Sequence, residues 1–288
     1  MAKSGLVNRL MCGLALALAA NCASAAQYTD DPAVPDFSSG ERTWVLATPQ
    51  EDITSFGRLP GDTGPGPISD LAGYHYVQNE SNRISDTEHP LLQPWAREVL
   101  RRGNETVLAG GVPFVNTSRC WPEGVPGLLL SPGQAVIYLQ APGQVWIVYA
   151  RDSQLRRIYL DVEHSEKPPY TAYGESVGHY ENGDTLAIDT IALAPTGPID
   201  RWRTPHTKQL HVAERHQLMN DDQNIQVVFT VDDPGAFTAP WHGMVQFARG
   251  RPPRSDRFEE TICNENATEF FVPEEGLVPS PRDDTPDF

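Results

Sequence analysis

Between residues 134 and 248 the sequence alternates apolar and polar positions in short segments, a pattern typical of β-strands with one buried face. Residues 144–150 show it clearly, because Val145, Ile147 and Tyr149 fall on one side and Trp146 and Val148 on the other. The same pattern, with two weaker segments outside this region, predicts strands at residues 43–47, 134–140, 144–150, 155–161, 175–181, 184–191, 208–219, 224–231, 244–248 and 269–272.

Short turn signals join most of these segments. Asn182-Gly183 is the strongest hairpin signal, and residues 141–143 and 220–222 supply two further turns. A meander of this length must close or form two sheets to avoid exposed strand edges. We therefore predict a mainly β protein, an antiparallel meander that closes into a lipocalin-like barrel, with a β-sandwich as the alternative.

The rest of the chain predicts an irregular arm, one helix and a tail. Residues 27–110 form the arm, with a short helix near residues 93–102 that starts at Pro94, stops at Gly103 and packs through Trp95. The barrel domain is expected at residues 111–272. Residues 273–288 are rich in proline and acids and are expected to be disordered.

Residues 1–26 have the features of a secretory signal peptide. Lys3 and Arg9 precede a short apolar run, and small residues follow it up to Ala26. The run is too short for a helix that spans a bilayer. We therefore expect a cleaved leader and a periplasmic or secreted protein without stable membrane insertion; a lipid anchor at Cys22 is left open, although Asn21 makes it a poor lipidation site.

The net charge limits the classes of partner that the protein can bind, and the cysteine content predicts a disulfide. The net charge is −16, and cleavage of the leader removes two cations and no acids, which takes it to −18. Such an excess of acids disfavours nucleic acid and anionic membranes as partners. Cleavage also leaves only Cys120 and Cys263, which predict one disulfide that closes a loop of about 140 residues; two separate buried thiols are the alternative.

The strand expected at residues 208–219 places ionisable groups on its apolar face. Period-two alternation puts Glu214 and His216 on the same side as Leu210, Val212 and Leu218. An unpaired charge inside a barrel is costly, so two interpretations compete. Either Glu214 pairs with an arginine of a neighbouring strand and is structural, or it lines a pocket and moves a proton.

Other candidate groups surround this strand. Gly174–Gly178 matches the G-x-S-x-G pattern of serine hydrolases, but a hairpin follows instead of the helix that this motif needs. Neither two cysteines far apart nor His206 with His211 has the spacing of a metal site, so no metal is expected. The candidate acid/base residues are His164, His179, His211, Glu214 and Asp189, and the candidate substrate-binding residues are Tyr159, Tyr170, Tyr173, Trp202 and Arg215.

The run from Arg157 to Trp241 resembles a group of uncharacterised secreted bacterial proteins with the pattern R-x-I-Y-x-D, G-x-S-x-G-x-W-E-G-D-T-L, L-H-V-x-E-R, D-D-P and P-W. Here Tyr180 replaces the tryptophan, and Asn182 is an extra residue in the turn. The resemblance covers less than half of the chain, and it implies a secreted, lipocalin-like barrel without indicating an activity. The matching positions are Arg157, Ile158, Tyr159, Asp161, Gly174, Ser176, Gly178, Glu181, Asp184, Thr185, Leu186, Leu210, His211, Val212, Glu214, Arg215, Asp232, Asp233, Pro234, Pro240 and Trp241.

Three functions fit these observations. The first is an exported enzyme with an internal barrel cavity, in which it acts on a small, partly apolar or aromatic molecule by acid/base chemistry, as a lyase, isomerase or hydrolase. No phosphate-binding loop or dinucleotide fingerprint is present in the sequence, which favours a reaction without a cofactor. The alternatives are a non-catalytic, lipocalin-like binding protein of the periplasm and a surface protein whose loops bind another protein.

Overall fold

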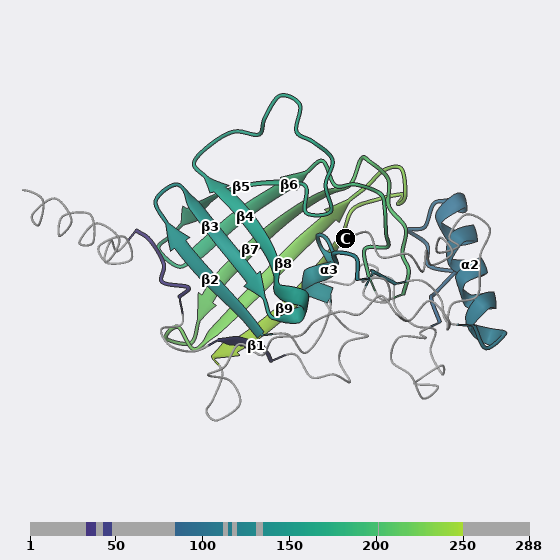
Figure 1. Ribbon diagram of the computed structural model, residues 1–288, viewed down its shortest axis with the longest axis horizontal. Coiled ribbons are helices and arrows are strands. Elements are labelled where there is room, and N and C mark those ends of the chain that lie inside the picture. The colour runs from purple at the N-terminus through teal and green to yellow at the C-terminus, as the bar shows by residue number, and fades with distance from the viewer. Residues whose placement is uncertain are drawn as a thin grey trace, which may run out of the picture.

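A computed structural model describes residues 33–38, 43–47, 84–111, 115–116, 120–130, 135–200 and 202–249. In this part of the chain nine strands form a closed barrel, in which each strand pairs with its sequence neighbours and β9 closes onto β1 (Figure 1). Closure confirms the predicted barrel and rules out the sandwich. The strands are β1 (Trp44–Leu46), β2 (Ala135–Ala141), β3 (Gln144–Tyr149), β4 (Gln154–Leu160), β5 (Glu175–Glu181), β6 (Thr185–Ile191), β7 (His211–Met219), β8 (Asn224–Asp232) and β9 (Trp241–Arg249).

Strand boundaries agree with the predicted segments to within a residue or two, except at two starts. β7 begins at His211 instead of residue 208, because residues 208 and 209 form a turn, and β9 begins three residues early at Trp241. The predicted strand at residues 269–272, the leader, most of the N-terminal arm and the tail lie outside the described residues, as does Cys263. The pairing of Cys263 with Cys120 stays a prediction.

The odd number of strands departs from a pure meander. A closed ring of nine strands cannot reverse direction at every step, so at least one neighbouring pair must be parallel. That pair is β4–β5, while all other neighbours are antiparallel. Parallel neighbours need a long connection, and here it is the crossover loop, residues 161–174, which leaves the barrel wall at the top of Figure 1.

Short turns close the hairpins as predicted. Asn182 and Gly183 both adopt positive φ (56° and 71°), the backbone that a two-residue hairpin turn between twisted strands requires. Asn220, Asp221 and Asp222 also adopt positive φ between β7 and β8. Residues that tolerate the left-handed region therefore set the register of both hairpins.

The helix α2 (Pro94–Leu108) starts at the predicted proline but runs through Gly103. The predicted stop was wrong: Gly103 lies inside the helix, where a Cβ would lie 2.8 Å from Nε of Arg203, so close packing accounts for the glycine. The predicted packing face was also wrong, since Trp95 is 42% exposed and the buried positions are Ala96, Leu100 and Asn104. A second helix, α3 (Gly127–Leu130), and a 3-10 turn, η3 (Arg151–Ser153), were not predicted.

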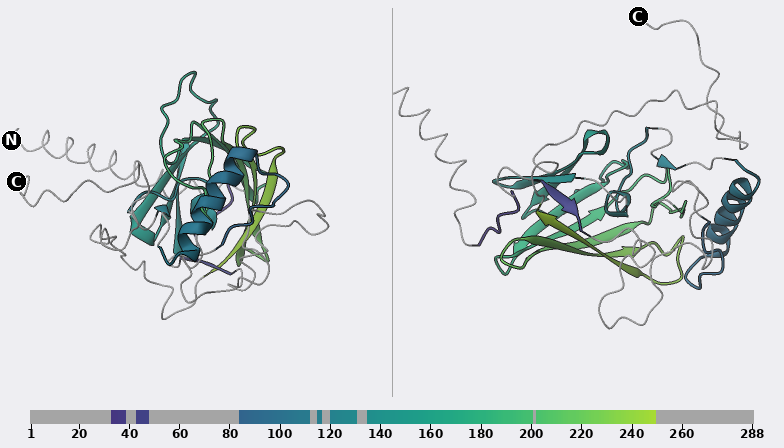
Figure 2. Two further views of the ribbon diagram at one scale, coloured as in Figure 1. Left: turned by 90° about the vertical axis from the view of Figure 1, so that its right-hand side faces the viewer. Right: turned by 90° about the horizontal axis from the view of Figure 1, so that it is seen from below.

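Large side chains fill the barrel, and other elements cover its ends. Trp44, Tyr138, Tyr149, Phe229 and Trp241 are almost fully buried. The helix α2 lies across one end of the barrel (Figure 2), and residues 33–38 lie at the opposite end (Figure 1), where the ring of Phe37 stacks on Tyr138 at 5.3 Å. Within the described ranges, these large side chains occupy interior space in which a cavity is expected from the sequence.

This packing predicts that a glycine at position 243 is required for full stability of the folded protein. The ring of Phe229 occupies the space where a Cβ of residue 243 would lie, 2.0 Å from the ring's Cζ. Gly243→Ala should therefore destabilise the protein by about 1–3 kcal/mol through overpacking. Urea unfolding followed by tryptophan fluorescence would measure it. His242→Ala, at an exposed position on the same strand, is the control and should stay within about 0.5 kcal/mol; equal stability of the two variants would contradict the prediction.

Candidate functional site

Glu214 lies in the barrel core and forms an ion pair with Arg156. The guanidinium of Arg156 on β4 donates to both carboxylate oxygens of Glu214 on β7, at 2.6 and 2.9 Å. The two side chains are 1% and 0% exposed. Of the two interpretations of Glu214, pairing with an arginine is therefore the one observed, although the arginine comes from across the barrel and not from an adjacent strand.

Further polar groups complete a buried network around this pair. His216 bonds to Glu214 through Nε2 (3.0 Å) and to the hydroxyl of Tyr138 through Nδ1 (2.7 Å). Arg156 also donates to Ser176 (3.2 Å) and Thr190 (2.8 Å). Ser176, the serine of the G-x-S-x-G match, is thus a buried structural residue, and the network links β2, β4, β5, β6 and β7.

The charge of Arg156 decides the protonation of Glu214. Burial alone would raise the pKa of this carboxyl group, but the adjacent guanidinium and the hydrogen bonds from His216 and Arg156 outweigh burial and lower the pKa to about 2. Glu214 is therefore ionised with both oxygens occupied. It does not join the other predicted site residues.

Three of the other predicted residues, Asp189, His211 and His164, lie together on the outer wall beside the crossover loop. Asp189 on β6 accepts hydrogen bonds from Nε2 of His211 on β7, at 2.5 and 2.7 Å to its two oxygens. His164 of the crossover loop approaches the same carboxylate, with Nε2 3.9 Å from Oδ1 of Asp189. Period-two alternation explains the location, because Asp189 and His211 occupy the outward positions of their strands.

Glu175 fixes the position of His164, and the sequence analysis did not select it. Its Oε1 lies 3.1 Å from Nδ1 of His164 and accepts from the backbone N–H of Ser165 at 2.7 Å. The Ser165 hydroxyl donates to Oε2 at 2.5 Å. Although burial opposes ionisation, these hydrogen bonds lower the pKa of Glu175. Its outward position at the start of β5 is the signal that could have identified it.

The half-exposed pair His211–Asp189 has coupled pKa shifts. The hydrogen bond from His211, followed by its positive charge, lowers the pKa of Asp189 against the effect of burial. The same hydrogen bond raises the pKa of His211. Asp189 is therefore an ionised acceptor, which places a proton on Nε2 of His211 and leaves Nδ1 to gain or lose a proton.

Two depressions flank this pair on the outer wall. The larger, which we call the outer groove, has a volume of about 640 Å³ and is lined by Asp189, His179 and Arg215, among others. The smaller, the tyrosine hollow, has a volume of about 480 Å³ and is lined by His211, Tyr170, Lys208 and Ile191, among others. The ammonium of Lys208 lies 5.2 Å from the ring centre of Tyr170. Each depression thus receives one member of the His211–Asp189 pair.

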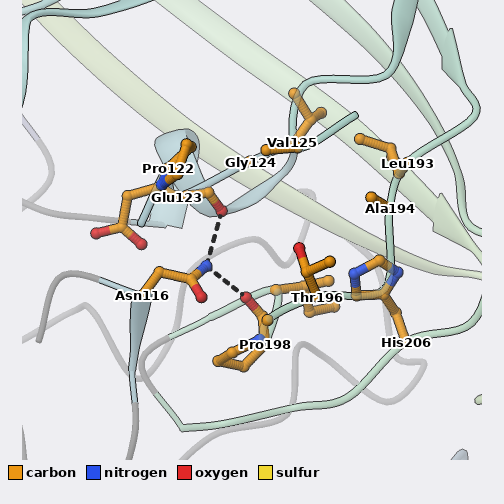
Figure 3. A pocket seen from close by; sticks show the side chains of 13 residues that line it. Asn116, Pro122, Glu123, Gly124, Val125, Leu193, Ala194, Thr196, Pro198 and His206 are labelled. Atoms are coloured by element: carbon orange, nitrogen blue, oxygen red, sulfur yellow. Dashed lines mark hydrogen bonds between the residues drawn. The ribbon is translucent and has the colours of Figure 1, made fainter. Parts of the chain in front are cut away.

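A third pocket lies near α3 and is too small for a substrate. Its volume is about 20 Å³, enough for roughly one water molecule. Figure 3 shows the amide of Asn116 donating to the carbonyl oxygens of Glu123 (3.3 Å) and Pro198 (3.0 Å) at its edge. His206 also lines it, and burial lowers the pKa of this histidine.

The remaining predicted residues lie apart from the pair. On the outer face of β4, Tyr159 stacks against Arg157, whose guanidinium carbon is 4.4 Å from the ring centre. Tyr173 donates to Gln154 at 3.0 Å, and Trp202 is buried at the end of the barrel near α2. Arg215 and His179 both bond to Glu181 at the far side of the outer groove.

Comparisons with known proteins add no relationship: no protein-family model matches the chain, and no curated protein matches it. The resemblance to secreted bacterial proteins stays a prediction. Within the described ranges, no helix is long and apolar enough to cross a membrane. Those same ranges contain no group of three or more histidine, cysteine or carboxylate side chains arranged to hold a metal ion.

The buried pair predicts a double-mutant result. Arg156→Met leaves Glu214 charged in the core and should destabilise the protein by about 3–5 kcal/mol. Adding Glu214→Leu removes that charge and should recover most of the loss. Chemical denaturation of the wild type, both single variants and the double variant measures the coupling. Additive losses would show that the two side chains do not depend on each other.

The outer pair predicts a pH dependence. A raised His211 pKa gives stability that is present below its ordinary value of 6.5 and lost as the pH rises through the folded pKa. A lowered Asp189 pKa gives stability that is present above 3.8 and lost as the pH falls through the folded pKa. The wild type should therefore exceed Asp189→Asn in melting temperature most clearly between about pH 4 and 6.5.

The titration of His211 itself provides the direct measurement. Its ring proton signals, followed by NMR, should titrate at a higher pH in the wild type than in Asp189→Asn. Thr230→Val, on the same wall, serves as the control and should leave the pH at which His211 titrates unchanged. An unchanged His211 titration in Asp189→Asn would contradict the assigned contact.

Proposed function

We propose that the protein is an exported enzyme that acts on a small, partly apolar or aromatic molecule by cofactor-free acid/base chemistry, with His211 as the group that moves the proton. The substrate occupies the tyrosine hollow, on the outer wall of the barrel. Export follows from the predicted leader at residues 1–26.

A single observation carries this proposal: an imidazole held by a carboxylate opens onto a depression of substrate size. His211 is 42% exposed, so a ligand in the tyrosine hollow can reach it. The contact with Asp189 fixes the ring and its tautomer. A general base needs this combination of reach and orientation.

The chemical step follows from the tautomer. In the neutral ring Nδ1 carries the lone pair, so it takes a proton from an acidic C–H or O–H of the substrate. The imidazolium formed is stabilised by ionised Asp189 and returns the proton to the product or leaving group from the same nitrogen. Tyr170 and Ile191 supply aromatic and apolar contact surface, and Lys208 supplies a cation for developing negative charge.

Proton exchange tests this function without knowledge of the substrate. The purified protein in D₂O is incubated with a panel of small enolisable aryl ketones and hydroxy acids, and NMR follows deuterium incorporation at the acidic C–H. We expect exchange above the buffer rate, a loss of about 10²–10⁴-fold in His211→Asn, and a smaller loss in Asp189→Asn. Isomerisation, elimination and ester cleavage are followed on the same samples.

His242→Asn is the matched control, an exposed histidine of the outer wall whose Nδ1 bonds to Thr230 at 2.9 Å. It should retain the wild-type rate. Exchange at the wild-type rate in His211→Asn would remove His211 from the mechanism. Binding of panel members in the tyrosine hollow without turnover would favour the alternative, a non-catalytic small-molecule binding protein.

A further inference from the structure

The outer groove has an apolar floor made of small side chains. Val177, Ala187, Ala213 and Val228 occupy outward positions on β5, β6, β7 and β8, and all four line the groove. Strand register places them in two adjacent rows. In one row Val177 and Ala213 lie on either side of Asp189. In the other row Ala187 and Val228 lie on either side of Arg215. Because the alanine side chains are shorter than their polar neighbours, the outer surface of the barrel is recessed at this point.

Carboxylates dominate the rim of the groove. Asp161, Glu163, Glu181 and Asp189 face one guanidinium, from Arg215, and one imidazole, from His179. Both basic groups already bond to Glu181. The bond from Arg215, more than any other contact, lowers the pKa of Glu181. In the described part of the chain Asp161 and Glu163, both exposed, form no ion pair. The groove is therefore negative whether or not His179 is protonated.

We propose that the outer groove is a second binding site, separate from the tyrosine hollow, for a small organic cation with an apolar portion, such as a primary amine on a short aromatic or hydrocarbon group. The apolar portion lies on the valine and alanine floor. The ammonium group lies among Asp161, Glu163 and Asp189. An anion would be repelled by the uncompensated carboxylates there. A neutral molecule would leave those carboxylates without a cationic partner.

Asp189 couples this site to His211. Its carboxylate lines the groove, while the same oxygens accept the hydrogen bonds from His211. A cation bound beside Asp189 weakens the attraction that Asp189 exerts on the imidazolium, so occupancy of the groove lowers the pKa of His211. By linkage, protonation of His211 weakens amine binding to the same extent.

Three probes of matched shape test the proposal: 2-phenylethylamine, 2-phenylethanol and 3-phenylpropionate. Each is titrated into the full chain at pH 7.5 and low salt, and binding is followed by calorimetry and by NMR of groove residues. The amine should bind at least about tenfold more tightly than the alcohol, the carboxylate should not bind, and added salt should weaken the amine. Equal affinities, or a preference for the alcohol or the carboxylate, would overturn the proposal.

Variants locate the site. Glu163→Gln and Asp161→Asn should each reduce the preference for the amine, and Ala213→Phe should abolish binding by filling the floor. Asp221→Asn, which removes a carboxylate from the β7–β8 turn, is the control and should bind as the wild type does. Wild-type amine binding in Ala213→Phe would place the amine elsewhere and overturn the assignment.

This outcome is independent of the proposed enzyme function. His211→Asn removes the proton-transfer group but leaves the floor and the rim, so amine binding should persist in it. A failure of proton exchange with intact amine selectivity would reject only the enzyme function. Exchange without amine selectivity would reject only the second site.

Discussion

The ion pair between Arg156 and Glu214 is the interaction on which the core depends. Two opposite charges removed from water gain stability only when their geometry is good and their remaining donors and acceptors are satisfied. Both conditions hold here, because the pair is bidentate and Ser176, Thr190 and His216 bond to the rest of the two groups. The network spans the barrel, so it joins strands that make no backbone hydrogen bonds with each other.

That network also lies where the barrel deviates from a simple meander. Arg156 sits on β4 and Ser176 on β5, the one parallel pair among the nine strands, and Thr190 sits on the next strand. The parallel pair in turn requires the crossover loop, and the loop brings His164 to the outer wall beside Asp189. The odd strand count and the location of the candidate site thus have a common origin in the topology.

Alternation along the chain predicted which residues face inward. It separated Leu210, Val212, Glu214, His216 and Leu218 from the outward residues of the same strand, and the structure confirms that division. It could not identify Arg156 as the partner of Glu214, because the two lie on strands that are not neighbours. The packing of Arg203 against Gly103 was equally invisible, because the two residues lie a hundred positions apart, and so the glycine predicted a helix stop that is not observed.

From the sequence, the candidate residues are expected to face the interior, whereas the structure places Asp189 and His211 on the outer wall. A barrel built like a lipocalin suggests an internal cavity. In the described part of the chain, aromatic side chains of β2, β3, β8 and β9 occupy interior space, and a pattern of apolar positions does not show how much of that space they take up. His164, His211 and Asp189 do come together, on the opposite side of the wall. Glu214 stays in the core, and His179 bonds to Glu181. Local periodicity gave the face of each residue, and only the closed structure shows what each face contacts.

Residues 162–170 of the crossover loop make no strand pairing with the barrel, whereas Thr171 near its end forms a parallel bridge to Leu193. Insertions, deletions or substitutions in its middle can therefore reshape the chemical surroundings of the outer wall while every strand keeps its register. Divergent copies of such a gene could acquire new ligand preferences through this one segment, with the scaffold inherited unchanged.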